Sequence, residues 1–183
     1  MMRPFLTALY KLSGVLAALC ILSIAGLVFA QVCLNLVDKL AAGVTGQAIG
    51  LTIPSYSDFT GFLLAASTFL GLAYTLREGG HIRVTLVTGL LGATPKRWVE
   101  MLVLIIALGM VAYATVYMCL LVIESHEFGD RTSGMVSLPL WLVQSPVAVG
   151  LTVLSIALLD ELICNLKGLP ASYDGKGENL LNE

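Results

Sequence analysis

The chain has 183 residues, of which 57% are hydrophobic and 12% charged, and its mean hydropathy is +0.90. This composition excludes an ordinary soluble globular domain and indicates that lipid is the solvent for most of the chain. The net charge of −2 gives no support to nucleic-acid binding.

The first apolar run, residues 12–37, contains no charged residue. It exceeds the roughly 20 residues that a helix needs to cross a bilayer, so it predicts the first transmembrane span. A cleaved signal peptide is the alternative, because Arg3 and Lys11 precede the run and Ala30 could mark a cleavage site. The run is longer than the usual apolar core of about 7 to 15 residues, so we interpret it as a retained helix.

Residues 38–58 are rich in glycine, serine and threonine, which is typical of a loop rather than of a buried helix. The segment is expected to be a loop or to lie along the membrane surface. Residues 59–76 follow without a charge and predict the second span.

A basic elbow joins the second and third spans. It contains Arg77, His81, Arg83, Lys96 and Arg97, and Thr94-Pro95 predicts the start of the next helix. The charge-free residues 101–123 predict the third span.

A mainly acidic segment, residues 124–138, is expected to end the third helix and to connect it with the fourth span, residues 139–159. Asp160 and Glu161 are expected to close that span. The tail, residues 165–183, has no apolar period and is expected to be flexible. Trp98 and Trp141 stand where interfacial tryptophans occur.

Basic residues distribute unequally between alternate loops. Eight fall on one side and two, Lys39 and Arg131, on the other. By the positive-inside rule, the termini and the elbow face the cytoplasm. The sequence therefore predicts an all-α membrane protein of one domain with four transmembrane helices, N-in and C-in.

Small residues recur at helical spacing in two of the spans. Such residues allow close helix approach, either within the chain or to a partner. The predicted packing or partner faces contain Gly14, Ala18, Gly26, Ala30, Ala148, Thr152 and Ser155.

The four charge-free runs contain no Asp, Glu, Lys, Arg or His for catalysis or proton relay. Gln31, Asn35 and Gln144 lie near span ends, where their amides are expected to reach the interface. His81 and His126 fall on opposite sides of the membrane, which argues against a shared haem. We expect no catalytic residue, no cofactor and no metal.

The four cysteines form no Cys-x-x-Cys pair and no cluster with histidine, so zinc and redox spacings are missing from the sequence. A disulfide between Cys33 and Cys119 at one membrane edge is left as an alternative.

The residues Arg77, Gly79, Gly80, His81 and Arg83 are expected to form a structural anchor at the cytoplasmic surface. An arginine can keep its apolar stem in the membrane while its guanidinium binds a lipid phosphate or a partner carboxylate. The two glycines permit the turn that commonly ends a helix. A proton relay through His81 is the alternative.

The elbow motif, residues 77–84, resembles the signature of the small membrane subunit of TRAP transporters, the DctQ-like family. Residues 137–141, with Pro146 and Gly150 beyond them, are also similar to that family's entry to span four. Thr85, Gln31-Val32 and Ala148 depart from residues common in the family.

The resemblance implies a non-enzymatic subunit of a tripartite importer in the bacterial inner membrane. Its partners would be a large TRAP membrane subunit, a periplasmic substrate-binding protein and phospholipid. The complex would take up an organic acid, such as a C4-dicarboxylate or sialic acid, with sodium. The alternative is a free-standing tetraspan protein, such as a redox or quinone-linked subunit.

Overall fold

A computed structural model describes residues 2–78 and 93–167, with side chains for 5–44, 46–78 and 97–167. In these ranges all regular elements are helices, four of them long and apolar enough to cross a membrane, which confirms the predicted all-α class with four spans. The predicted N-in and C-in orientation stays a prediction. They are α1 (Met2–Thr45), α2 (Tyr56–Arg77), α4 (Ala93–Glu127) and α5 (Leu140–Leu166).

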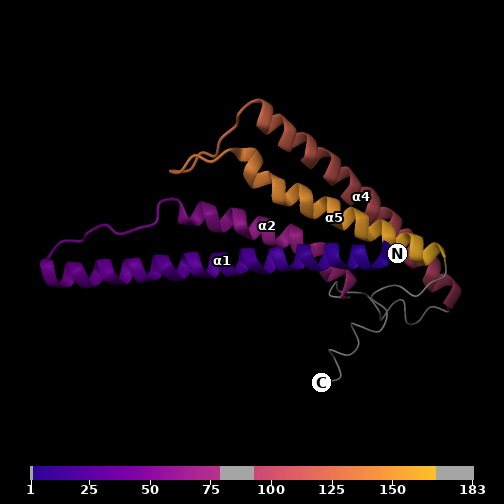
Figure 1. Ribbon diagram of the computed structural model, residues 1–183, viewed down its shortest axis with the longest axis horizontal. Coiled ribbons are helices and arrows are strands. Elements are labelled where there is room, and N and C mark those ends of the chain that lie inside the picture. The colour runs from indigo at the N-terminus through magenta and orange to yellow at the C-terminus, as the bar shows by residue number, and fades with distance from the viewer. Residues whose placement is uncertain (1, 79–92, 168–183) are drawn as a thin grey trace, which may run out of the picture.

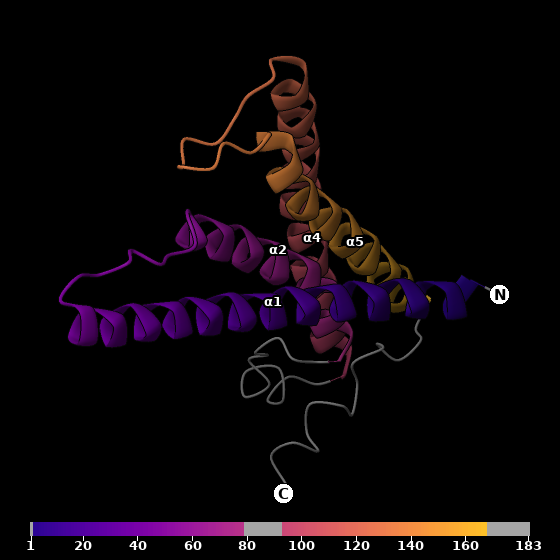
Figure 2. The ribbon, with the colours of Figure 1, turned by 60° about the vertical axis from the view of Figure 1, so that its left-hand side comes forward.

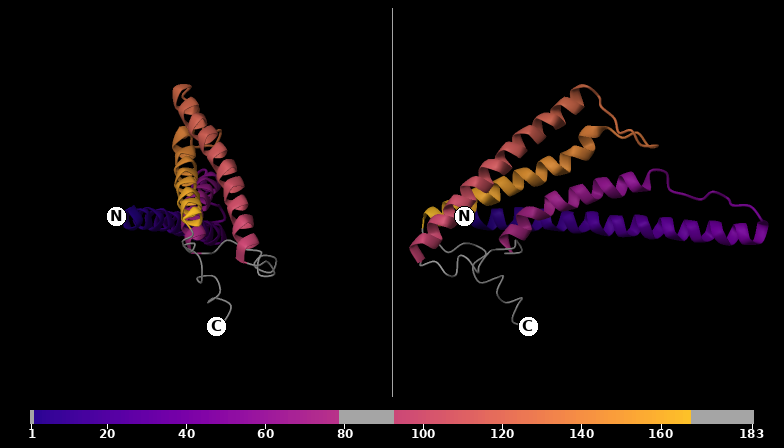
Figure 3. Two further views of the ribbon diagram at one scale, coloured as in Figure 1. Left: turned by 90° about the vertical axis from the view of Figure 1, so that its right-hand side faces the viewer. Right: turned by 180° about the vertical axis from the view of Figure 1, so that it is seen from behind.

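The helices form two antiparallel pairs, α1 with α2 and α4 with α5, and the pairs meet where α2 packs against α5 (Figure 1). The start of α1, the end of α2, the start of α4 and the end of α5 lie together at what we call the convergent end. From there the pairs splay apart toward the divergent end (Figure 3). The helices α2 and α5 are therefore internal, and α1 and α4 flank them.

The first helix is longer than its charge-free run. It begins at Met2 and continues through Asp38 and Lys39 to Thr45. The prediction that residues 38–58 form a loop is therefore wrong for 38–45, and also for 56–58, which belong to α2. Only residues 46–55 connect α1 with α2. Polar side chains on one exposed face do not interrupt the backbone hydrogen bonds of a helix, which is why charge alone misplaced this boundary.

The last two helices also pass through the charges that were expected to end them. α4 includes Glu124 and His126 and ends at Glu127. Pro139 precedes α5 as its N-cap, where its missing N–H costs no hydrogen bond within the helix. At the other end the helix runs past Asp160 and Glu161 to Leu166. The prediction that the flexible tail begins at residue 165 is therefore wrong for 165 and 166; residues 168–183 lie outside the described part.

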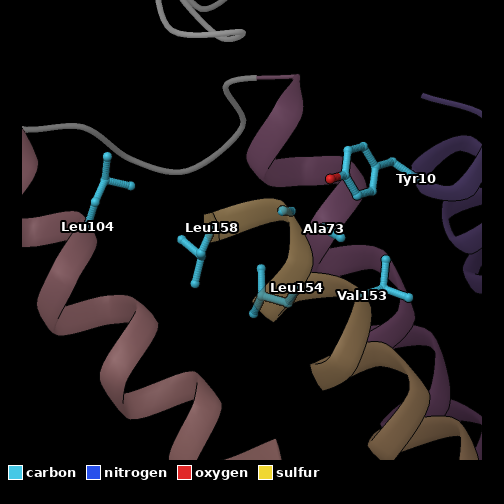
Figure 4. Packing of buried hydrophobic residues seen from close by; sticks show 7 residues of the cluster. Tyr10, Ala73, Leu104, Val153, Leu154 and Leu158 are labelled. Carbon is cyan, nitrogen blue, oxygen red and sulfur yellow. The ribbon is translucent and has the colours of Figure 1, made fainter. Parts of the chain in front are cut away.

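The main apolar core lies near the convergent end, where all four helices contribute side chains (Figure 4). Ala73 of α2 is fully buried there, between Tyr10 of α1 and Leu154 and Leu158 of α5. Leu104 of α4 completes the cluster. Most other large apolar side chains point outward, as expected for a protein whose outer surface faces hydrocarbon.

Candidate functional site

The two helix pairs approach each other to backbone distance at Gly150 of α5. A Cβ atom built on this glycine would lie 2.5 Å from the carbonyl carbon and oxygen of Phe69 in α2. Ala148, two residues before it, is also buried. A side chain at position 150 would push against backbone, which cannot rotate away, so Gly150 sets the separation of α2 and α5.

The α1–α2 contact also depends on small residues, supplemented by one polar bond. Ser13 of α1 is buried and its Oγ donates to the Leu70 carbonyl of α2 at 2.5 Å. Ala17 packs one turn further along. Gly14 faces Tyr74, whose ring would lie 2.8 Å from an added Cβ.

The small residues predicted as packing or partner faces divide into two groups. Gly14, Ala148 and Ser155 pack inside the chain, and the Ser155 hydroxyl lies 3.0 Å from that of Thr115 in α4. The remaining residues are exposed on α1 and α5, and nothing lies within 4 Å of a Cβ added to Gly26. This exposed group comprises Ala18, Gly26, Ala30 and Thr152.

Two arginines tie the convergent end together. The Arg77 guanidinium lies 5.2 Å from the ring centroid of Tyr10, within the range of a cation–π interaction. Arg97 of α4 donates to the carbonyl oxygens of Asn165 at 2.8 Å and Leu166 at 3.1 Å. These carbonyls are among those that a helix end leaves unpaired, so Arg97 caps α5.

Buried polar side chains at this end were missed by sequence reasoning. Glu161 is 5% exposed, Asn165 9% and Tyr10 2%. Within the described residues, the Tyr10 hydroxyl and the Asn165 Oδ1 have no hydrogen-bond partner. The i to i+4 spacing of Glu161 and Asn165 on an apolar helix was the available signal, because that spacing places both on one face.

The remaining residues of the predicted anchor, Gly79, Gly80, His81 and Arg83, lie outside the described residues. Their role therefore stays a prediction. Arg77 is half-buried and occupies the last turn of α2, where a cation complements the helix dipole.

At the divergent end Gln31 is 5% exposed, so the prediction that its amide reaches the interface is wrong. Its Nε2 donates to the Thr52 hydroxyl at 3.1 Å and to Asn35 Oδ1 at 3.0 Å, while its Oε1 accepts the Ile53 N–H at 2.8 Å. Further along α1, Asp38 accepts the Gly50 N–H at 2.7 Å. These bonds hold residues 46–55 against α1.

A second link at this end joins the two pairs. The Ser55 hydroxyl accepts the Val136 N–H at 3.1 Å, so the loop of residues 128–139 contacts the start of α2. In Figure 2 this loop extends from α4 and α5 over the α2 side. Trp141, half-buried, makes an edge contact with His126 at 5.5 Å between ring centroids, whereas Trp98 is 67% exposed.

Chemically, these arrangements hold helices together rather than gather reactive groups. Within the described ranges, no three His, Cys, Asp or Glu residues are placed to hold a metal ion. None of the four cysteines, all within the described residues, forms a disulfide, so the alternative of a disulfide between Cys33 and Cys119 is not realised. An apolar cavity of ≈ 240 Å³ lies where Leu27, Phe62 and Leu142 of three helices face each other.

Comparison with known proteins gives one family match. The family described as "Tripartite ATP-independent periplasmic transporters, DctQ component" matches residues 40–168, which is more than half of the chain. No curated protein matches this chain.

Proposed function

Since this chain belongs to the family of DctQ components of tripartite ATP-independent periplasmic transporters, we propose that it braces the large membrane subunit of such a transporter during sodium-driven uptake of an organic acid. Its four apolar helices indicate a multi-pass membrane protein, and its family is one of transporter components. The bracing role, the ion, the substrate and the bacterial inner membrane as its location are the proposed part.

A brace must keep its shape under load, and the described contacts supply that rigidity. The helix pairs meet at backbone distance at Gly150, Arg97 ties α4 to α5 at the convergent end, and Ser55 ties α2 to the 128–139 loop at the divergent end. The Gly150 contact and the Ser55 link oppose sliding of one pair against the other, and the Arg97 link holds α4 and α5 together within their pair.

The observation that carries the proposal is the exposed small-residue surface of α1. Ala18, Gly26 and Ala30 point away from the chain's own helices, and the space beside Gly26 is open. Because lipid tails are as apolar as the side chains, helices associate in a membrane through close packing, which small residues permit. We therefore place the contact with the large subunit on α1 between residues 18 and 30.

The substrate and sodium sites then belong to the large subunit, with a periplasmic binding protein as the third component. The charge-free runs of this chain offer no carboxylate to coordinate sodium and no cation to bind an organic acid. At the proposed cytoplasmic side, Arg77 and the elbow residues would anchor the chain to phospholipid or to a partner carboxylate.

Copurification of the complex in mild detergent tests the proposed contact. Gly26→Leu should lower the amount of large subunit retained with this chain, because leucine fills the open space beside α1. Gly109→Leu is the matched control, since Gly109 is also exposed in mid-helix, on α4, and has nothing within 4 Å of an added Cβ. Normal retention with Gly26→Leu, or loss only with Gly109→Leu, would show that α1 is not the contact.

A further inference from the structure

The far part of α1, residues 32–44, extends beyond the rest of the helix pair toward the divergent end (Figure 1). We call this part the arm. One of its faces is covered, because Gln31 and Asp38 hold the connecting residues 46–55 along it. The opposite face is uncovered and apolar: Val32 is 58% exposed, Leu36 57%, Leu40 62% and Val44 88%.

We propose that the arm lies in the headgroup region of the bilayer, with Val32, Leu36, Leu40 and Val44 buried in the lipid leaflet of the divergent end. The occupant of the uncovered face is therefore phospholipid. This arm is separate from the proposed contact with the large subunit, which ends at Ala30.

The length of α1 supports the location of the arm at the membrane surface. Exposed apolar side chains run along α1 from Leu12 to Val44, a distance of about 48 Å at 1.5 Å per residue. The hydrocarbon core is only about 30 Å thick. A helix tilted by about 40°, the upper end of the usual range, keeps about 39 Å in that core. The excess of about 9 Å must project into water or follow the membrane surface.

The splay of the two pairs favours the second outcome. In Figures 1 and 2 the axis of α5 is oblique to that of α1, and α4 is steeper still, so α1 and α5 cannot both stand upright in one bilayer. The 27 residues of α5 correspond to about 40 Å, which needs little tilt once the headgroup layers are included. The 44 residues of α1 correspond to about 66 Å, so α1 is the tilted helix.

The amphipathic character of the arm gives a third argument. Leu36 and Leu40 are exposed apolar residues on the face opposite Gln31 and Asp38. Lys39 is exposed beside them, and a lysine at this depth can extend its ammonium to the headgroups while its stem stays in lipid. The arm therefore matches an amphipathic helix at a membrane surface.

Spin labels can measure the depth of the arm in the assembled transporter reconstituted in lipid nanodiscs. Single cysteines replace Leu36, Leu40 and Val44 in a chain whose native cysteines are alanine. Collision with oxygen, which concentrates in lipid, is compared with collision with a water-soluble nickel chelate. Ser133→Cys, in the exposed loop, is the water control, and Ile106→Cys, on the exposed face of α4, is the lipid control.

We expect nickel collision at Leu40 and Val44 to be severalfold lower than at Ser133, with oxygen collision close to that at Ile106. Nickel collision equal to that at Ser133 would overturn the proposal, because the arm would project into water. Low collision with both reagents would also overturn it, because protein would then cover the face.

A second measurement covers the case in which the cysteine-free chain does not fold. Val44→Trp in the otherwise native chain should add fluorescence that lipids brominated near the headgroup quench more strongly than lipids brominated at the chain end. Absence of quenching by either lipid would overturn the proposal. Quenching that is unchanged when this chain is expressed without the large subunit confirms that the contact is with lipid.

Discussion

Replacing Gly150 by alanine tests the central contact of this fold. The added Cβ would lie 2.5 Å from the Phe69 carbonyl and 2.8 Å from the Leu70 nitrogen. Carbon atoms in contact normally stay about 3.5 to 4.0 Å apart, so α2 and α5 would have to separate by about 1 Å. The atoms of Phe69 and Leu70 that the Cβ would meet are all backbone atoms, so no rotamer change relieves the overlap.

The expected loss of stability follows from overpacking, which typically costs about 1 to 3 kcal/mol. Alanine gains up to about 1 kcal/mol over glycine in helix propensity, so the net effect of Gly150→Ala should be a loss of roughly 0 to 2 kcal/mol. Gly109→Ala is the matched control: it receives the same propensity gain, and nothing lies within 4 Å of its Cβ. It should leave stability unchanged or slightly raised.

Thermal unfolding in detergent, followed by a thiol-reactive fluorophore, measures the difference. Cys164 is buried and becomes reactive when the helices separate, whereas the exposed Cys33 is first replaced by alanine. Gly150→Ala should lower the unfolding temperature by several degrees relative to Gly109→Ala. Equal unfolding temperatures for the two variants would refute a close α2–α5 approach at this glycine.

Substitutions at three further residues test the links at the two ends. Arg97→Ala should lower the free energy of unfolding by about 0.3 to 1 kcal/mol, because the last carbonyls of α5 lose a cationic donor. Arg97→Lys should restore part of this loss in the same thermal assay. Equal stability of the native chain and the two variants would contradict the cap. Gln31→Leu should speed hydrogen exchange of the Ile53 amide, which loses its acceptor, and unchanged protection would show that this bond is not formed. Tyr10→Phe keeps the ring beside Arg77 and removes a buried hydroxyl that has no partner in the described residues; its unfolding temperature should not fall, and a fall would reveal a bond to the hydroxyl.

The four spans could be predicted from the sequence because the length of a charge-free run is a local property. The ends of the helices could not, since a charged residue ends a span without ending the helix. Glu161 shows the limit most clearly. It follows a charge-free run and looks like a residue of the membrane edge, yet the packing of α5 among the other helices buries it. Burial of this kind depends on which helices meet, and a single run does not encode that.

The small residues of α1 do not all lie on one face of the helix, for a geometric reason. A helix turns about 100° per residue, so each step of four residues advances the row by about 40°. From Gly14 to Ala30 the row rotates by about 160°. Gly14 therefore packs against Tyr74 inside the chain, while Gly26 and Ala30 point outward. The prediction of close packing holds for the first residue, and the prediction of a partner face stays open for the others.

Gly150 illustrates the complementary case. The sequence places it in a motif shared with the small subunit of TRAP transporters, and the family match supports that resemblance. The structure adds the physical reason, which is the approach of the Phe69 backbone. That approach joins two segments about 80 residues apart in the chain, so no local pattern could have identified it.

The two flanking helices differ in what they offer a neighbour. The exposed surface of α4 carries large side chains, among them Met110 and the paired rings of Tyr113 and Tyr117, whose centroids lie 4.5 Å apart. Such a surface keeps another helix axis at a distance, and lipid chains adapt to it readily. The exposed part of α1 near Gly26 allows a partner's backbone to approach instead. If α1 provides the protein contact and α4 faces lipid, a bulky residue at position 26 should disturb assembly and the same residue at position 109 should not.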